Sequence, residues 1–389
     1  MVAVASCFSQ VLSLVERQDF ASAVSHHKAE KGAKGFSCWD QFVSMMFCQL
    51  GAANSLREIC GGLATAMGKL VHLGLRDAPS RSTLAYANHK RPWELYQTLF
   101  EKVLVRCQSL AATKKRKFRF KNPLRSLDAT VIDLCLEVFD WARFRRTKGA
   151  IKLHLLLDHQ GYLPCWAMVT DGKTHEVNPA RTLSFAPGTI VAMDRAYNDY
   201  KLFAQWTGDG VFFVTRAKDN IVYEVIERRE VPQRGNVLSD ETLSLTGAKA
   251  EEKCPHPLRR VVVWDEENQR EIVLLSNCFH LAASTVAAIY KERWQIELFF
   301  KAIKQNLKVK TFMGTSENAV KTQIWTALIA ILLLKFLQLK SSWSWSMSNL
   351  AAMMRFNLLT YRDLWAWLDD PYNIPIVEPE TAQLSLFAA

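Results

Sequence analysis

Four short apolar runs with the residue types of β-strands lie between Leu127 and Met193, and they constrain the fold more than any other feature. They cover residues 127–134, 150–157, 162–169 and 189–193. The last run is almost wholly apolar, as expected of a central strand buried on both faces of a sheet. A crossover helix is expected between Thr174 and Phe185. Three strands followed by a helix and a strand predict a mixed α/β sheet.

Helical patterns flank this strand-rich part. Residues 1–110 place apolar side chains at helical spacing, with Ser55 and Ser80 as expected N-caps. These short helices fit either a helix-turn-helix DNA reader or a plain helical bundle. Further along the chain we expect a second strand-rich block over 210–280, a long helix over 282–305, a core helix over 319–339 and a loose tail after Pro371.

The charge of the chain favours a polyanion as partner. Its 49 Lys and Arg residues against 38 Asp and Glu residues give a net charge of +11, although a basic enzyme of another kind would show the same excess.

The nine cysteines form no CxxC pair and no zinc-type cluster with histidine, as expected in a reducing cytoplasm. The N-terminus lacks a signal-peptide pattern and the longest apolar run, 324–334, is too short to span a bilayer. We therefore expect a soluble, cytoplasmic protein.

The densest run of basic residues stands directly before the first predicted strand. Six of the eight residues of 114–121 are basic, and Phe118 and Phe120 are interleaved with them. Such a run is usually a solvated linker, but its position before the strand favours contact with phosphates. The candidate DNA-binding residues in it are Lys114, Lys115, Arg116, Lys117, Arg119 and Lys121.

Two aspartates occupy positions where an unpaired carboxylate is costly. Asp128 lies inside one predicted apolar strand, and Asp194 directly follows another. Each alone is better explained by a structural role, a salt bridge or a strand-end cap, than by catalysis. Neighbouring strands can nevertheless bring both carboxylates to one edge of a sheet.

The predicted helix over 282–305 carries polar residues on one face. Tyr290, Arg293, Glu297 and Lys304 fall within roughly 60° of arc at about 100° per residue. Alone, this face is explained by solvent exposure and an Arg293–Glu297 pair. With Asp128 and Asp194 it supplies three carboxylates and several cations, the set that two-metal phosphoryl transfer requires.

These residues resemble the motifs of bacterial insertion-sequence transposases of the DDE type. Tyr290, Arg293, Glu297 and Lys304 match the Tyr-x2-Arg-x3-Glu-x6-Lys signature of the insertion-sequence-four class, while Asp128 and Asp194 match its two catalytic aspartates. The resemblance runs from about residue 30 to residue 340. It includes 36–42 and 55–59, which are similar to the family's helical entry domain.

The resemblance implies a ribonuclease-H-like mixed sheet core, interrupted by a β-rich insertion, with helical N- and C-terminal regions. The domains expected from it are a helical DNA-binding domain over 1–110, the core in two parts over 111–209 and 281–310, the insertion over 210–280, a helical C-terminal region over 311–370 and a tail over 371–389.

The resemblance also implies metal-dependent cleavage of the element's ends and strand transfer into target DNA. Asp128, Asp194 and Glu297 would bind two Mg²⁺ ions, or Mn²⁺ in their place, and Tyr290, Arg293 and Lys304 would contact DNA near the cleaved end. The expected partners are double-stranded DNA and a second copy of the chain in a homodimer on that DNA. A ribonuclease-H-like nuclease without strand transfer and a DNA-binding regulator with a decayed active site remain as alternatives.

The C-terminal tail contains a further short motif. Its glutamine amide and three apolar side chains suit docking in a preformed apolar groove, and the pentapeptide resembles the one with which bacterial proteins bind the DNA-polymerase sliding clamp. A chance match in a tail strand or helix end is the alternative. The residues of this motif are Gln383, Leu384, Ser385, Leu386 and Phe387.

Overall fold

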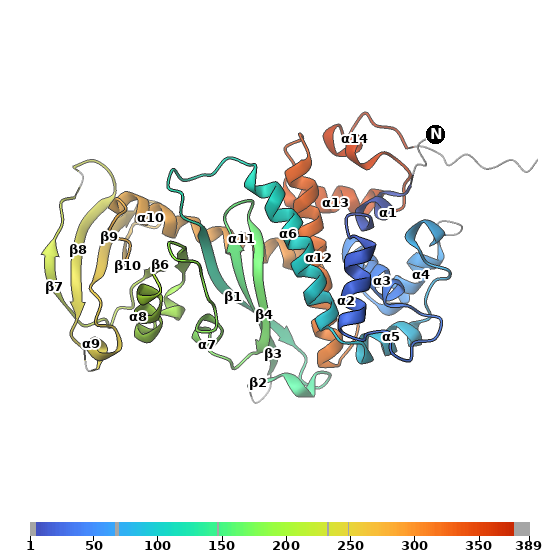
Figure 1. The fold of residues 1–389 in the computed structure, drawn as a ribbon, viewed down its shortest axis with the longest axis horizontal. Helices are drawn as coiled ribbons and strands as arrows, with labels where there is room; N and C mark the ends of the chain where they lie inside the picture. The colour runs from blue at the N-terminus through green and yellow to red at the C-terminus, as the bar shows by residue number, and fades with distance from the viewer. Residues whose placement is uncertain (1–4, 67–69, 146–147, 232, 248, 377–389) are drawn as a thin grey trace, which may run out of the picture. The chain divides into compact units, whose positions relative to one another are not determined.

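The computed structural model describes residues 5–66, 70–145, 148–231, 233–247 and 249–376. The chain divides into two compact units (Figure 1). One contains the residues up to Ala111 and those from Ala302 onward, and the other contains Ala112–Lys301.

The first unit is helical. Ser55 and Ser80 accept hydrogen bonds from the backbone N–H groups of Glu58 and Thr83, each at 3.1 Å, which confirms both as N-caps. Its elements are α1 (Cys7–Leu12), α2 (Arg17–His26), α3 (Cys38–Leu50), α4 (Leu56–Ala64), η1 (Leu70–Leu73), α5 (Arg81–Lys90), α6 (Glu94–Ala112), α12 (Glu317–Lys340), α13 (Met347–Asn357) and α14 (Leu364–Asp369).

Helix α12 is the core of this unit. It packs against α3, α5 and α13. Among the described residues it is the one helix long and apolar enough to cross a membrane, and 83% of its most apolar window is buried within the protein. The core helix expected over 319–339 is confirmed as α12, and even its polar residues Thr322, Gln323 and Thr326 are buried. Its composition is explained by burial in the core.

The second unit contains a mixed sheet, as predicted. In the described part of the chain the strand order is β2-β3-β1-β5-β6-β10-β9-β8-β7, with β4 paired to β3. β1 is antiparallel to β3 and parallel to β5, and β6 is parallel to β5. The strands are β1 (Leu124–Leu134), β2 (Arg143–Arg145), β3 (Lys148–Asp158), β4 (Leu163–Asp171), β5 (Ile190–Met193), β6 (Phe212–Arg216), β7 (Tyr223–Arg228), β8 (Val237–Leu245), β9 (Leu258–Asp265) and β10 (Arg270–Ser276).

Strand β8 is absent from the sequence expectations. Polar residues such as Ser239, Asp240 and Glu241 interrupt its apolar alternation. The strand forms because β7 and β9 pair with its two edges. The strands within 210–280 thereby extend the same sheet that contains β1 and β5.

The two faces of the sheet bury different side chains because alternate residues of a strand point to opposite faces. Leu127 and Val191 face a cluster that includes α8 (Tyr200–Gly208), whereas Leu124 and Ile190 face a cluster that includes α10 (Ala283–Glu292). Figure 1 shows α8 and α10 beside the sheet. The remaining elements of the unit are η2 (Asp140–Ala142), η3 (Arg195–Tyr197), α7 (Val177–Ala180) and α9 (Ala250–Lys253), and α11 (Trp294–Asn306) continues into the helical unit.

Two sequence expectations about helices are corrected. The crossover helix expected between Thr174 and Phe185 is a single turn, α7. The long helix expected over 282–305 is interrupted at Arg293, which separates α10 from α11. There the Arg293 N–H bonds to the carbonyl of Tyr290, three residues back, at 3.1 Å. This tighter 3₁₀-type turn breaks the regular four-residue ladder.

A buried ion pair joins β8 and β9 to the chain that leads into α10. Arg259, which is 2% exposed, donates from Nε and Nη2 to the two carboxylate oxygens of Asp240, at 2.8 and 2.6 Å. Its Nη1 donates to the carbonyls of Cys278 and Leu281, each at 2.6 Å. Both charges are therefore compensated inside the protein.

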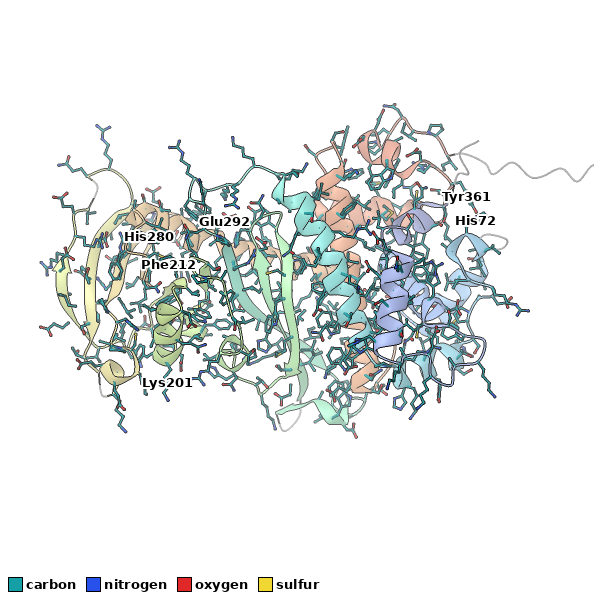
Figure 2. The ribbon with its side chains drawn as sticks, viewed as in Figure 1. His72, Lys201, Phe212, His280, Glu292 and Tyr361 are labelled. Atoms are coloured by element: carbon teal, nitrogen blue, oxygen red, sulfur yellow. The ribbon has the colours of Figure 1, made fainter. Side chains whose placement is uncertain are left out.

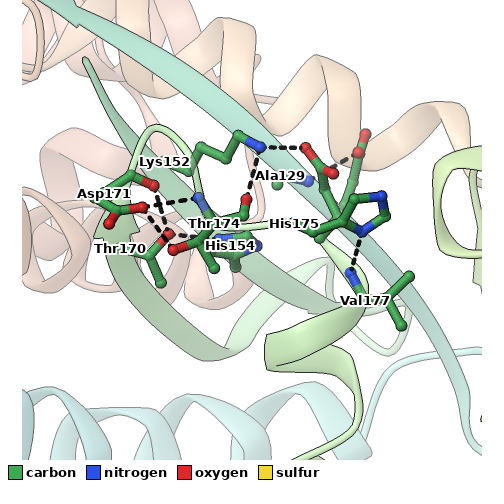
Figure 3. Close-up of polar contacts among 10 residues, drawn as sticks. Ala129, Lys152, His154, Thr170, Asp171, Thr174, His175 and Val177 are labelled. Carbon is green, nitrogen blue, oxygen red and sulfur yellow. Dashed lines mark hydrogen bonds and ion pairs between the residues drawn. The ribbon is translucent and has the colours of Figure 1, made fainter. Parts of the chain in front are cut away.

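A second buried polar cluster lies on β3, with its partners on β4 and the segment before α7 (Figure 3). Lys152 donates to Glu176 at 2.7 Å and to the Thr174 carbonyl at 2.8 Å. His154 is fully buried and contacts the Thr170 hydroxyl at 2.9 Å. Burial lowers the pKa of His154 to about 4.

We expect Arg259→Met to lower the free energy of unfolding by about 3–5 kcal/mol, because it leaves the Asp240 carboxylate buried without its main partner. The double variant Asp240→Leu, Arg259→Met removes both charges and should lose less. Urea denaturation measures both. A double variant at least as unstable as the single one would contradict this account.

We expect stability to fall as pH falls from about 6.5 towards 4. The imidazole of the unfolded chain binds a proton in this range, whereas the folded His154 stays neutral until about pH 4. Between pH 7 and pH 5 this group should cost about 2 kcal/mol of stability. The free energy of unfolding of His154→Gln, measured by urea denaturation, should therefore fall by about 2 kcal/mol less than that of the wild type between pH 7 and pH 5. A pH dependence equal to that of the wild type would contradict the assignment.

Candidate functional site

The sheet places Asp128 and Asp194 at adjacent positions on neighbouring strands. The parallel register of β1 and β5 pairs Leu127 with Met193. Asp128 and Asp194 directly follow these two residues along the chain, and they therefore lie next to each other. By the alternation of the strands both fall on the face covered by α10. Asp128 Oδ1 accepts from the Ala129 N–H at 2.8 Å, and Asp194 Oδ1 accepts from the Ala196 N–H at 3.1 Å.

Arg293 links the first of these aspartates to the helix. Its guanidinium donates from Nη2 to Glu297 Oε1 at 2.6 Å, and its Nη1 lies 3.5 Å from Asp128 Oδ2. The Arg293 side chain is 11% exposed, against 20% for Asp128 and 34% for Glu297. The break between α10 and α11 is located at this residue.

The site concentrates negative charge around Asp128. Burial raises the pKa of Asp128 to about 6, against the lowering effect of the Ala129 N–H and of Arg293, and Asp194 and Glu297 raise it further. Burial acts to lower the pKa of Arg293, but Tyr290, Glu297 and Asp128 raise it above its ordinary value. A cation among these carboxylates is therefore stabilised, and here Arg293 is that cation.

The donors have the chemistry of a magnesium site, although they are not gathered around one point. Carboxylate oxygens are the ligands that Mg²⁺ prefers, and Asp194 and Glu297 are near enough to act on the pKa of Asp128. Within the described ranges, no three His, Cys, Asp or Glu side chains are close enough together to hold an ion as they stand. The Arg293 guanidinium lies where a shared cation of Asp128 and Glu297 would lie.

Tyr290 belongs to the same group of side chains. The Arg293 guanidinium carbon lies 5.6 Å from the centre of its ring, within the range of a cation–π contact. Burial raises the pKa of the half-buried Tyr290 hydroxyl. Lys304 lies two turns beyond Glu297 on α11, in the portion assigned to the helical unit, and is half-buried.

The basic segment 114–121 is anchored by its aromatic residues. Phe118 and Phe120 stack with ring centres 4.9 Å apart and pack against the cluster beneath α10. Two of the cations have protein partners, since Arg116 donates to the Lys121 carbonyl at 2.6 Å and Lys117 pairs with Glu292. All six basic residues are exposed, namely Lys114, Lys115, Arg116, Lys117, Arg119 and Lys121. The motif Gln383–Phe387 lies outside the described residues.

Glu292, labelled in Figure 2, is missing from the sequence predictions, although the Tyr162 hydroxyl and the Lys117 ammonium both contact its carboxylate. Its side chain is 5% exposed. A signal for it exists in the sequence: Glu292 shares the helical spacing of Ile289 and Ile296, both fully buried. An acidic residue on an apolar face requires partners.

Comparisons with known proteins identify the family. Residues 119–333, more than half of the chain, match the family described as "Transposase DDE domain". Residues 4–76 match a family described only as a domain of unknown function, DUF4372.

Two curated relatives agree with this match. The chain is 30% identical to the "Probable transposase for insertion sequence element IS5377" of Geobacillus stearothermophilus, over 71% of this chain and 72% of that one. It is 32% identical to a protein of Sinorhizobium fredii described as a transposase, y4zB, over 72% of this chain and 77% of that one.

The chain is more remotely similar to a structure of the piggyBac transposase synaptic complex with hairpin DNA. The TM-score is 0.42, and the identity is 10% over 96% of this chain and 82% of that one. The family match and the two relatives establish the family. The chain belongs to the transposases with a DDE domain, among relatives from bacterial insertion sequences.

Proposed function

We propose that this transposase binds the ends of its insertion sequence, cuts them in a metal-dependent reaction and joins the freed 3′-OH to target DNA. The observation that supports this most directly is the arrangement of Asp128, Asp194 and Glu297, two at adjacent strand positions and the third joined to Asp128 through Arg293. The Tyr290, Arg293, Glu297 and Lys304 spacing favours the insertion-sequence-four class.

Members of this family generally use divalent metal ions. Asp128, Asp194 and Glu297 would hold two Mg²⁺, or Mn²⁺, which would activate the attacking oxygen and stabilise the leaving oxygen. In this proposal Arg293 releases Asp128 and Glu297 as DNA enters and donates to a phosphate, for which its planar fork is suited. Tyr290 and Lys304 would contact DNA beside the cleaved bond.

We assign the ribonuclease-H-like core to β4, β3, β1, β5 and β6. The support is topological, because three antiparallel strands adjoin two strands parallel to β1. The β-rich insertion, expected over 210–280, would then begin only after β6 and contain β7, β8, β9 and β10, and the helices of 1–110 would contact DNA. We propose a homodimer on paired element ends in the bacterial nucleoid.

The basic segment would extend the DNA surface. Lys114, Lys115, Arg116, Arg119 and Lys121 are exposed and follow one another along the chain. Such a run gains affinity by releasing counterions from DNA, and this gain weakens as salt rises.

Asp128→Asn and Glu297→Gln should each slow cleavage of end DNA in Mg²⁺ on the order of 10²–10⁴-fold, because metal ions supply several kcal/mol of transition-state stabilisation. A gel assay of nicking and of joining to target DNA measures both steps. Asp133→Asn is the matched control, since Asp133 is an exposed residue of the same strand.

Each alternative function gives a different result in that assay. Nicking without joining would favour a nuclease, and binding without chemistry in wild type and variants would favour a regulator. If the Asp128 and Glu297 variants cut at the wild-type rate, the assignment of the site is wrong.

We also propose that the motif Gln383–Phe387 docks on the DNA-polymerase sliding clamp. A synthetic peptide of residues 377–389 should bind purified bacterial clamp, and a peptide with Leu386→Ala and Phe387→Ala should bind at least about tenfold more weakly, because each lost apolar anchor costs about 1.5–3 kcal/mol. Equal binding of the two peptides, or none by either, in fluorescence anisotropy would remove this assignment.

A further inference from the structure

Glu292 is buried in the sheet unit with partners from two other segments of the chain, the basic segment 114–121 and the turn between β3 and β4. The Tyr162 hydroxyl donates to its Oε1 at 2.7 Å, and the Lys117 ammonium pairs with its Oε2. His159 Nδ1 lies 3.9 Å from Oε1, and His159 Nε2 contacts the Ser126 hydroxyl at 2.7 Å. We call Glu292, Lys117, Tyr162, His159 and Ser126 the Glu292 cluster.

The cluster keeps the carboxylate charged inside the protein. Burial acts to raise the pKa of Glu292, but its contacts with His159, Lys117 and Tyr162 outweigh burial and lower the pKa to about 2. A buried carboxylate with this many partners holds its position, because losing any of them leaves polar groups uncompensated.

Tyr162 shows that the local backbone conforms to this contact. It adopts a φ of +53°, in the left-handed region that bulky residues rarely use, directly after Gly161 at φ +83°. The turn between β3 and β4 thus presents the tyrosine hydroxyl to Glu292 in a conformation that the surrounding structure must maintain.

The position of Glu292 in the chain connects the cluster to the candidate active site. Glu292 ends α10 and directly precedes Arg293, which bridges Asp128 and Glu297. Ser126 lies on β1, two residues before Asp128. At the junction after Glu292 the backbone hydrogen bonds span three residues instead of four. The Arg293 N–H donates to the Tyr290 carbonyl and the Ile296 N–H donates to the Arg293 carbonyl, both at 3.1 Å. Side-chain contacts are therefore needed to fix its angle.

We propose that Glu292 is a positioning residue that fixes the α10–α11 junction, and with it the direction of Arg293 and Glu297 towards Asp128. In this proposal Lys117 serves the same purpose, as the partner of a buried carboxylate, and is not a DNA-phosphate ligand like its neighbours in the basic segment. The expected effect of Glu292 on cleavage rests on the proposed function. Its expected effect on the conformation of the α10–α11 junction does not.

The test compares Glu292→Gln, Lys117→Met and Tyr162→Phe in the full-length protein. The matched control is Lys291→Met, which removes an exposed lysine one residue away that pairs with the exposed Glu267. DNA affinity is measured by anisotropy, and the nicking rate is measured in single turnovers with protein saturating the end DNA in Mg²⁺. Thermal unfolding confirms that each variant is folded.

We expect Glu292→Gln and Lys117→Met to nick at least tenfold more slowly at saturation while their DNA affinity changes less than threefold. Combining the two substitutions should add little to either alone, because both break the same contact. Lys291→Met should match wild type in both measurements. Tyr162→Phe, which removes a single hydrogen bond, tests the same contact if Glu292→Gln does not fold.

Hydrogen exchange of the DNA-free protein separates this inference from the proposed function. Glu292→Gln should speed exchange at the amides of 293–300 at least tenfold, whether or not the wild type cuts DNA. Wild-type nicking rates at saturation, or unchanged exchange over 293–300, would overturn the positioning role. Weakened DNA binding by Lys117→Met at an unchanged saturated rate would make Lys117 a phosphate ligand instead.

Discussion

The structure of the sheet unit depends on holding like charges close together inside a protein. Asp128 and Asp194 lie at adjacent strand positions, and Glu297 approaches from the helix that follows the Arg293 break. Arg293 compensates two of the three carboxylates in this structure. Carboxylates brought this close together are stabilised by a nearby cation, because each one disfavours the charged form of its neighbours.

The sequence allowed the proximity of the candidate carboxylates to be predicted, but not several features of the structure around them. Asp128 and Asp194 could be recognised because each follows or interrupts an apolar strand, and strand adjacency limits where their side chains can lie. Arg293 and Glu297 could be recognised from helical spacing, and their i,i+4 contact forms even though the helix is interrupted at Arg293. The direct contact of Arg293 with Asp128 required the three-dimensional structure, because nothing in the sequence specifies which face of the sheet the helix covers.

The features that sequence analysis missed arise from tertiary contacts. β8 has too many polar residues for an alternation pattern, and its pairing with β7 and β9 decides its conformation. The break at Arg293 contains no proline or glycine, so no local signal marks it. Lys117 belongs to a basic run typical of a solvated segment, yet its partner is a buried carboxylate 175 positions away. Long-range partners of this kind are not encoded in local spacing.

The most direct measurement of the central claim is iron-dependent cleavage of the protein itself. Fe²⁺ bound in place of Mg²⁺, with ascorbate and peroxide, generates radicals that cut the backbone beside the ion. The account predicts fragments ending near residues 128, 194 and 297, suppressed by excess Mg²⁺ and absent in Asp128→Asn. Cleavage at other positions, or the same fragments in the variant, would contradict the assignment of these carboxylates as the metal site.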